Sequence, residues 1–295
     1  MTGVQTCALP IYGRGPQITT SDLGTIIAAV DSKGNIFSWK QASLGKWVGV
    51  GTINNKDTTA KEGFVSLTAT QNNFYATWLD LRTGNNQIYI ASLDTSGEWK
   101  NKLLYTSPDT TVCECCKPNI FADATGTVHV MWRNWLKGSR DMYLSSFREG
   151  STPTIPQKLG MGTWKLKGCP MDGGGLSATT SGQVVSVWRR GDSLYIAEPG
   201  FPEQAFAKGI RPVIAYSDNF YLTLWEEGKN VVGKRYPDTT KIVLGEGKYP
   251  QLASSTKIIV SVWEGPDNQI FCRTFLKVVD NIHPSQFWSY NGTKK

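Results

Sequence analysis

The segment Asn73–Trp78 reads NFYATW, in which aromatic, small and β-branched residues lead to a tryptophan. Such a segment, bounded by Asn and Asp, is typical of a β-strand. The pattern recurs as TVHVMW ending at Trp132, QVVSVW at Trp188, NFYLTLW at Trp225 and KIIVSVW at Trp263. Recurrence along the chain indicates a fold assembled from similar units.

A shorter apolar segment precedes each of these strands. Most of these segments open on a proline, namely Pro16, Pro118, Pro170, Pro212 and Pro250, and one further unit opens near Gly63 with FVSL. A third strand follows each tryptophan, as QIYIAS, DMYLSS, SLYIAE, VVGKRY and QIFCRTF. Six units of about 47 residues have the length of propeller blades. We therefore predict an all-β fold, a six-bladed β-propeller of four-stranded antiparallel blades, over a β-sandwich with coincidental spacing.

The two ends of the chain differ from this repeat. Residues 1–11, MTGVQTCALPI, resemble a translated sequencing adapter, so we leave them out of the fold and expect any signal peptide to have been lost by truncation. We expect the propeller over 12–276 and a tail over 277–295 that packs on the last blade. Because propellers close by pairing one terminus into the other's blade, missing N-terminal residues are expected to contribute to closure.

Composition limits the partners of the chain. Its 295 residues carry a formal charge of +7, but Lys and Arg are scattered, so we expect no nucleic-acid partner. No apolar run reaches the length of a membrane span. A mildly basic surface attracts anionic ligands. Composition therefore leaves an acidic ligand open, and we expect an exported, monomeric protein that needs no cofactor.

Propeller topology predicts which residues share a face. The first strand of a blade crosses the ring and the second returns, so the residue before each proline lies beside the loop after each tryptophan. Near the axis this face would carry Arg14, Lys117, Cys169, Arg211 and Tyr249. Around them would lie Asp31, Asp80, Arg82, Arg133, Arg140, Asp141, Arg189, Arg190, Glu226 and Glu264. Loops that converge on a rigid scaffold commonly form a binding site.

The chain resembles the sialidase superfamily of six-bladed propellers from Arg14 to Phe275. Arg14-Gly-Pro16 matches the start of the first blade, Ser92–Trp99 is a degraded Asp box, and Tyr249-Pro-Gln-Leu252 matches the start of the last blade. The Asp box is a structural turn motif, so it supports the fold and not an activity.

The resemblance implies a set of site residues. An arginine triad that grips the sugar carboxylate would comprise Arg14, Arg189 or Arg190, and Arg211. Tyr249 would be the nucleophile, activated by a carboxylate base. The family has a glutamate as that base at the start of blade four, whereas Asp172 is the nearest carboxylate in this chain.

Two further assignments have structural alternatives. Asp31 would be the acid/base residue, although Asp-x-x-Gly is also an ordinary turn. The segment that holds Arg133, Trp135, Arg140 and Asp141 is either a sugar platform, with Trp135 stacked on a pyranose, or an Asp–Arg pair that joins neighbouring loops.

Four cysteines fall at the starts of two blades: Cys113, Cys115 and Cys116 in blade three, and Cys169 in blade four. Thiols gathered in this way form either disulfides or a metal site. The spacing Cys-x-Cys-Cys matches structural zinc poorly. We therefore expect no metal and favour at least one disulfide between the two blades, with a metal site as the alternative.

These observations give a leading function and two alternatives. The first is a sialidase-like glycoside hydrolase that acts on a terminal acidic sugar of a glycan. The second is a non-catalytic propeller that binds glycan or protein through the same face. The third is a metal or redox site centred on the cysteines.

Overall fold

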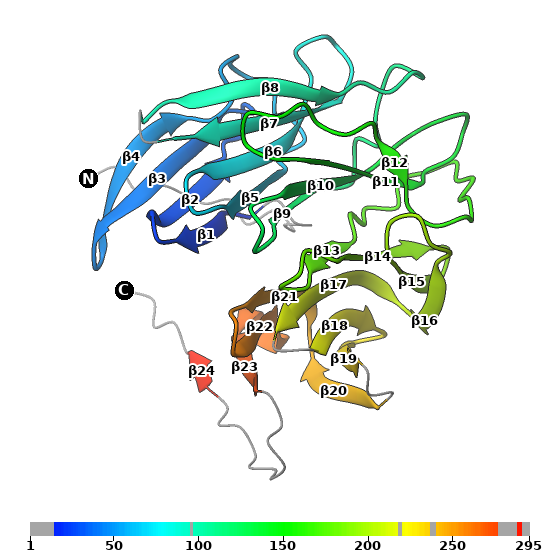
Figure 1. The fold of residues 1–295 in the computed structure, drawn as a ribbon. Coiled ribbons are helices and arrows are strands. Elements are labelled where there is room, and N and C mark those ends of the chain that lie inside the picture. The colour runs from blue at the N-terminus through cyan, green and yellow to red at the C-terminus, as the bar shows by residue number, and fades with distance from the viewer. Residues whose placement is uncertain (1–14, 95–96, 218–219, 237–239, 277–287, 291–295) are drawn as a thin grey trace.

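The computed structural model describes residues 15–94, 97–217, 220–236, 240–276 and 288–290. Strands β1 to β24 form six four-stranded antiparallel sheets arranged in a ring (Figure 1). This confirms the predicted all-β, six-bladed propeller. Within the described residues, no helix is long and apolar enough to cross a membrane.

The first three blades each follow the chain order from the innermost strand outwards. Blade one comprises β1 (Gln17–Ser21), β2 (Gly24–Val30), β3 (Ile36–Ser43) and β4 (Lys46–Thr52). Blade two comprises β5 (Val65–Ala69), β6 (Phe74–Asp80), β7 (Gln87–Leu93) and β8 (Trp99–Tyr105). Blade three comprises β9 (Asn119–Ala122), β10 (Val128–Arg133), β11 (Met142–Phe147) and β12 (Gln157–Lys158).

The last three blades repeat this order. Blade four comprises β13 (Gly175–Ala178), β14 (Val184–Arg190), β15 (Ser193–Ala197) and β16 (Gln204–Lys208). Blade five comprises β17 (Ile210–Ser217), β18 (Phe220–Glu227), β19 (Asn230–Tyr236) and β20 (Lys241–Glu246). Blade six comprises β21 (Lys248–Ser254), β22 (Ile258–Glu264), β23 (Ile270–Leu276) and β24 (Trp288–Tyr290).

The sixth blade takes its outer strand from the C-terminal segment, because β24 pairs antiparallel with β23. Residues 288–290 therefore belong to the propeller sheet, beyond the expected boundary at 276. Residues 1–11 lie outside the described residues.

In four blades the tryptophan near the end of the second strand packs on an aromatic residue directly opposite it in the third strand, whereas Trp225 of blade five lies opposite Val232. Trp78 pairs with Tyr89, Trp132 with Tyr143, Trp188 with Tyr195 and Trp263 with Phe271. Their ring centroids are 5.9, 6.4, 6.3 and 5.7 Å apart. Cross-strand aromatic pairs of this kind stabilise a sheet and fix its register. The repeated tryptophan is thus a structural feature of the blade.

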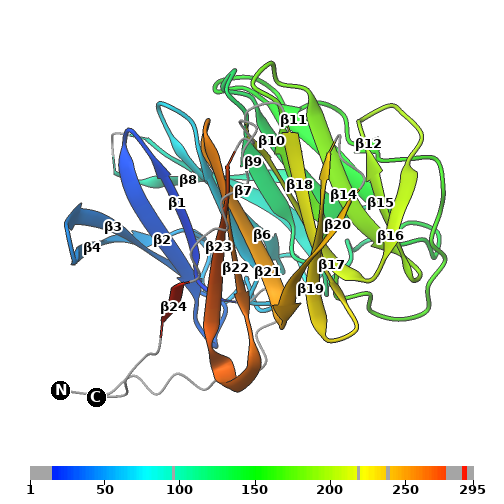
Figure 2. The same cartoon turned by 90° about the horizontal axis from the view of Figure 1, so that it is seen from below.

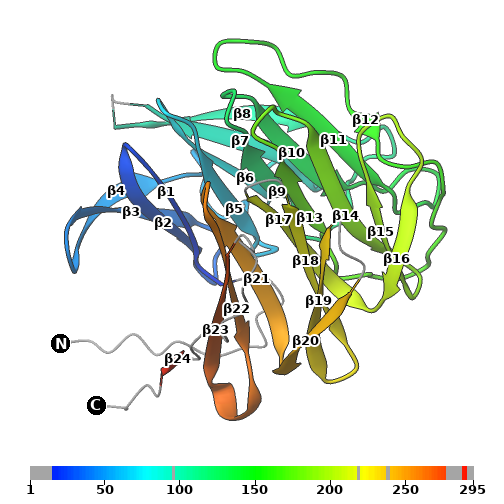
Figure 3. The ribbon, with the colours of Figure 1, turned by 60° about the horizontal axis from the view of Figure 1, so that its bottom comes forward.

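The apolar core lies between neighbouring blades. One buried cluster joins Ala28 and Ile36 of blade one to Trp78 of blade two, and another joins Leu222 of blade five to Trp263 of blade six. Blades two to five bury both faces in this way, because the ring places a neighbour on either side, whereas in the described residues no buried cluster joins blade six to blade one. Figures 2 and 3 show blade six, in orange, as the neighbour of blade one, in blue.

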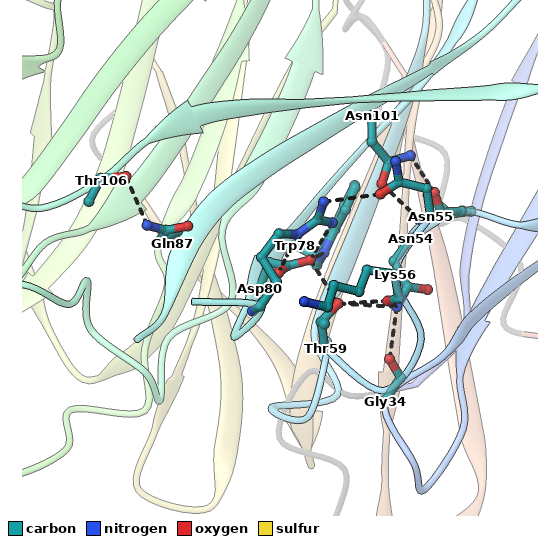
Figure 4. Close-up of polar contacts among 12 residues, drawn as sticks. Gly34, Asn54, Asn55, Lys56, Thr59, Trp78, Asp80, Gln87, Asn101 and Thr106 are labelled. Carbon is teal, nitrogen blue, oxygen red and sulfur yellow. Dashed lines mark hydrogen bonds and ion pairs between the residues drawn. The ribbon is translucent and has the colours of Figure 1, made fainter. Parts of the chain in front are cut away.

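Asp80 is a buried carboxylate at the junction of blades one and two. Asp80 accepts hydrogen bonds from Trp78 Nε1 at 2.8 Å and Thr59 Oγ1 at 2.9 Å (Figure 4). It also accepts three from Arg82, through the backbone N, Nε and Nη2, each at 2.9 Å. Asp80 is fully buried. Its contacts with Arg82 and Thr59 join the loop after β6 to the segment that precedes β5.

Candidate functional site

A pocket of about 360 Å³ opens at the axis of the ring on the predicted face. It is lined by the starts of the innermost strands of five blades, from Gln17 in blade one to Tyr249 in blade six, and by Val262–Glu264 and Ile270 of blade six. Lys117, Asp172 and Arg211 contribute charged groups to its wall. The topological prediction that residues before the prolines face the axis therefore holds for Lys117, Arg211 and Tyr249.

Three residues on this wall have a strained backbone. Met171, Arg211 and Tyr249 have φ values of 51°, 54° and 56°, in the left-handed region. For residues other than glycine this conformation costs about 1–2 kcal/mol, and such strain is common at functional sites. Arg211 and Tyr249 stand in equivalent places of blades five and six, each two residues after a glycine that packs on the blade's tryptophan.

Glu226 connects the strained residues of blades five and six. Its Oε2 accepts a hydrogen bond from Arg211 Nη1 at 2.6 Å, and its Oε1 accepts one from the Tyr249 backbone N at 2.7 Å. Burial raises the pKa of Glu226, an effect that Tyr249 and Arg211 oppose. The Arg211 guanidinium lies 4.8 Å from the centroid of the Tyr249 ring. Sequence placed Glu226 on this face but gave it no role.

Asp172 is held by the backbone around it. Its Oδ1 accepts a hydrogen bond from Gly174 N at 3.1 Å, and its Oδ2 accepts one from Arg211 N at 2.8 Å. The side chain is buried, with the residue 3% exposed. The structure therefore brings Asp172 to the same pocket as Tyr249, and it uses both carboxylate oxygens to fix the loop.

Lys117 is the least compensated charge on the pocket wall. Its Nζ donates a hydrogen bond to Oε1 of Gln17, at 3.1 Å. Among the residues that the structure describes, no carboxylate lies within ion-pair distance of this ammonium. Burial lowers the pKa of Lys117 to about 8. The sequence predicted that Lys117 lies near the axis, because it precedes Pro118, but it gave no sign that the ammonium lacks an anionic partner among the described residues.

The other predicted triad arginines lie elsewhere or are undescribed. Arg189 Nε donates to the carbonyl of Gly191 at 2.6 Å, and Arg190 pairs with Glu203 in the outer part of blade four. Neither arginine lines the axial pocket. Arg14 lies outside the described residues. Of the predicted triad, the structure places only Arg211 in the pocket.

The predicted sugar platform is largely enclosed. Arg133 is 1% exposed and donates to the carbonyls of Asp172, Arg140 and Arg189. Arg140 is also buried and lies 4.3 Å from the centroid of the half-buried Trp135 ring. These arginines hold loops together through backbone carbonyls, and the Asp–Arg pair that the sequence offered as the alternative is not formed in the described residues, since Asp141 pairs with Lys158.

Two carboxylates from the sequence prediction act as turn or loop residues. Asp31 accepts hydrogen bonds from Lys33 N and from the backbone and side chain of Asn35, as in an ordinary Asx turn. Burial alone would raise the pKa of Asp31, but these hydrogen bonds outweigh it and lower the pKa. Asp31 is therefore ionised at neutral pH and is a poor proton donor. Asp141 accepts from Trp164 N and pairs with Lys158. Neither carboxylate lines the axial pocket.

The cysteines of blade three form a buried group without Cys169. The structure has Cys113, Cys115, Cys116 and Cys169 as free thiols, and Cys169 is exposed. The expected disulfide between blades three and four is therefore not formed in it. Hydrogen bonds from Cys115 and Cys116, together with the charge of Arg140, outweigh burial and lower the pKa of Cys113 to about 3.

Comparison with known proteins extends no further than the fold. No family model matches the chain, and no curated protein matches it in sequence. Similar solved structures include the polysaccharide lyase Uly1 (TM-score 0.57, 8% identity, covering 88% of this chain and 76% of that one). Another is a triple arginine mutant of AofleA from Arthrobotrys oligospora (TM-score 0.56, 11% identity, covering 95% and 87%).

A third similar structure is YCF48 bound to the D1 peptide (TM-score 0.51, 12% identity, covering 87% of this chain and 77% of that one). At these identities the likeness shows the fold alone. The chain is a six-bladed β-propeller with a charged pocket at its axis.

Proposed function

We propose that the protein binds an anionic carbohydrate in the axial pocket, with Lys117 and Arg211 holding the carboxylate of the sugar. The observation that carries this proposal is the ammonium of Lys117, which lies on the pocket wall with one amide oxygen as its partner. A partly buried charge is unfavourable until an opposite charge compensates it, so the pocket favours an anion.

The shape and lining of the pocket support a sugar-sized ligand. A volume of about 360 Å³ lies in the range of small-molecule sites. Tyr249 is among the lining residues, and an aromatic residue suits the face of a pyranose. Among proteins of similar fold, Uly1 is described as a polysaccharide lyase.

Hydrolysis is the second candidate function. It is favoured by Tyr249, which lies on the pocket wall beside Arg211 and is held in a strained conformation. A tyrosine nucleophile needs a base, because the pKa of a free phenol is near 10. Both oxygens of Asp172 already accept backbone hydrogen bonds. The geometry therefore supports binding more directly than catalysis.

Calorimetric titration with N-acetylneuraminate, glucuronate and neutral galactose tests the proposal. We expect the two acidic sugars to bind and galactose to bind at least tenfold more weakly. Equal affinity for galactose, or no binding of either acid, would contradict it. Release of a fluorophore from a sialoside by the wild type but not by Tyr249→Phe would establish the second candidate.

A further inference from the structure

The sulfur atoms of the three cysteines of blade three lie as close together in space as the ligands of one metal ion. The Sγ atoms of Cys113, Cys115 and Cys116 lie 3.7, 3.5 and 3.9 Å apart, and all three residues are buried. In a tetrahedral zinc–thiolate site with Zn–S bonds near 2.3 Å, neighbouring sulfurs are about 3.8 Å apart. The three sulfurs thus form a triangle of the size of one face of such a tetrahedron.

Surrounding groups match the charge of a metal–thiolate centre. Arg140 Nη1 lies 2.9 Å from Cys113 Sγ, and the Cys113 backbone N donates to the Arg133 carbonyl at 3.1 Å. Three thiolates with a divalent or monovalent cation carry net negative charge, which a guanidinium compensates. Hydrogen bonds from surrounding groups to metal ligands orient those ligands and tune the properties of the metal.

We propose that Cys113, Cys115 and Cys116 bind one thiophilic metal ion, Zn²⁺ or Cu⁺, through three thiolates. Thiolate ligands select these ions over harder cations. The spacing in the sequence favoured a disulfide, but three thiols form only one disulfide and leave one sulfur over, whereas a metal uses all three. Cys115 also lines the axial pocket, so the metal would lie at the pocket wall.

Metal titration of the reduced full-length chain tests this proposal. In the zinc arm, Co²⁺ reports thiolate ligation through sulfur-to-cobalt charge-transfer absorption, and Zn²⁺ displaces it. In the copper arm, the protein competes with a chromophoric Cu⁺ chelator. We expect one ion per chain in at least one arm. A reduced, folded protein that binds neither ion would overturn the proposal.

Variants distinguish this site from adventitious binding. Cys113→Ser and Cys116→Ser are each expected to weaken binding at least 100-fold, whereas Cys272→Ser, in β23, should bind as the wild type does. Ligand variants that bind normally, or a control that loses binding equally, would overturn the assignment.

Alkylation of the wild type provides a readout that does not depend on variant folding. The metal should protect Cys113, Cys115 and Cys116 from iodoacetamide, while the exposed Cys169 is modified with or without metal. Equal labelling of the three buried cysteines in the presence and absence of metal, in fully reduced protein under conditions that label them, would contradict the proposal.

Discussion

Lys117 Nζ donates a hydrogen bond to Gln17 Oε1 at 3.1 Å, which joins blade three to blade one across the axial pocket. These residues are 100 positions apart in the sequence, and the ring brings them together. An amide oxygen compensates an ammonium only in part, because it carries a partial charge. The pair therefore leaves part of the Lys117 charge uncompensated on the pocket wall, where an anionic ligand would lie.

The first prediction concerns this ammonium. Lys117→Met should weaken binding of N-acetylneuraminate about 10- to 100-fold, the value of one charge-assisted hydrogen bond. Because the pKa of Lys117 is about 8, wild-type affinity should also fall as the pH rises through 8. Calorimetry at pH 7 and pH 9 measures both effects. Lys241→Gln, which removes an exposed lysine from blade five, is the matched control and should change affinity less than twofold.

The second prediction concerns the sign of the charge beside Arg211. Glu226→Gln keeps the side-chain shape but removes the anion that pairs with this guanidinium. Affinity for the acidic sugar should therefore rise about fivefold, from roughly 1 kcal/mol of lost repulsion. Affinity for neutral galactose should not change. A lower affinity for the acidic sugar in a folded Glu226→Gln protein would count against the proposed role of Arg211.

The third prediction concerns the contact between blades three and four. A Cβ at Gly173 would lie 2.1 Å from the carbonyl oxygen of Lys117, so Gly173→Ala must push these backbones apart. We expect the free energy of unfolding to fall by about 1–3 kcal/mol. Urea denaturation measures this change. Gly49→Ala, in β4, meets no atom within 4 Å and should be nearly neutral.

The fourth prediction concerns stability in acid. Glu203 accepts hydrogen bonds from Met161 N and Gly162 N and pairs with Arg190. Burial alone would raise the pKa of Glu203, but these contacts outweigh it and lower the pKa to about 2. Because this value lies below the ordinary 4.5, the stabilisation is complete above pH 4.5 and is lost as the pH falls toward 2.

Glu203→Gln should therefore cost about 2 kcal/mol at pH 7 and much less near pH 2. Denaturant unfolding at several pH values measures this difference. Glu227→Gln, which removes an exposed partner of Lys241, should cost no more than about 1 kcal/mol. An equal cost of the Glu203 variant at both pH values would contradict the assigned pKa.

The fold could be predicted because its determinants are local and repeated. Each blade carries its own strand pattern, and Trp132 or Trp263 packs on the residue that the hairpin places opposite it. The tail was expected on the last blade, but its pairing with β23 as strand β24 could not be predicted, since it depends on a short segment that returns to blade six from outside the repeat.

The site could be predicted only in part. Topology identified the axial positions of Lys117, Arg211 and Tyr249, because the direction of the first strand in each blade decides which face its first residues lie on. It could not show that the Arg133 guanidinium turns inward to three carbonyls, since loops from other blades provide them. Nor could the spacing of Cys113 and Cys116 reveal that their sulfurs lie 3.5 Å apart.

A crystal structure of the protein with N-acetylneuraminate tests the central claim most directly. We expect the sugar in the axial pocket, with its carboxylate within hydrogen-bond distance of Lys117 Nζ and the Arg211 guanidinium. A sugar bound elsewhere on the propeller, or one that turns its carboxylate away from both cations, would contradict the account.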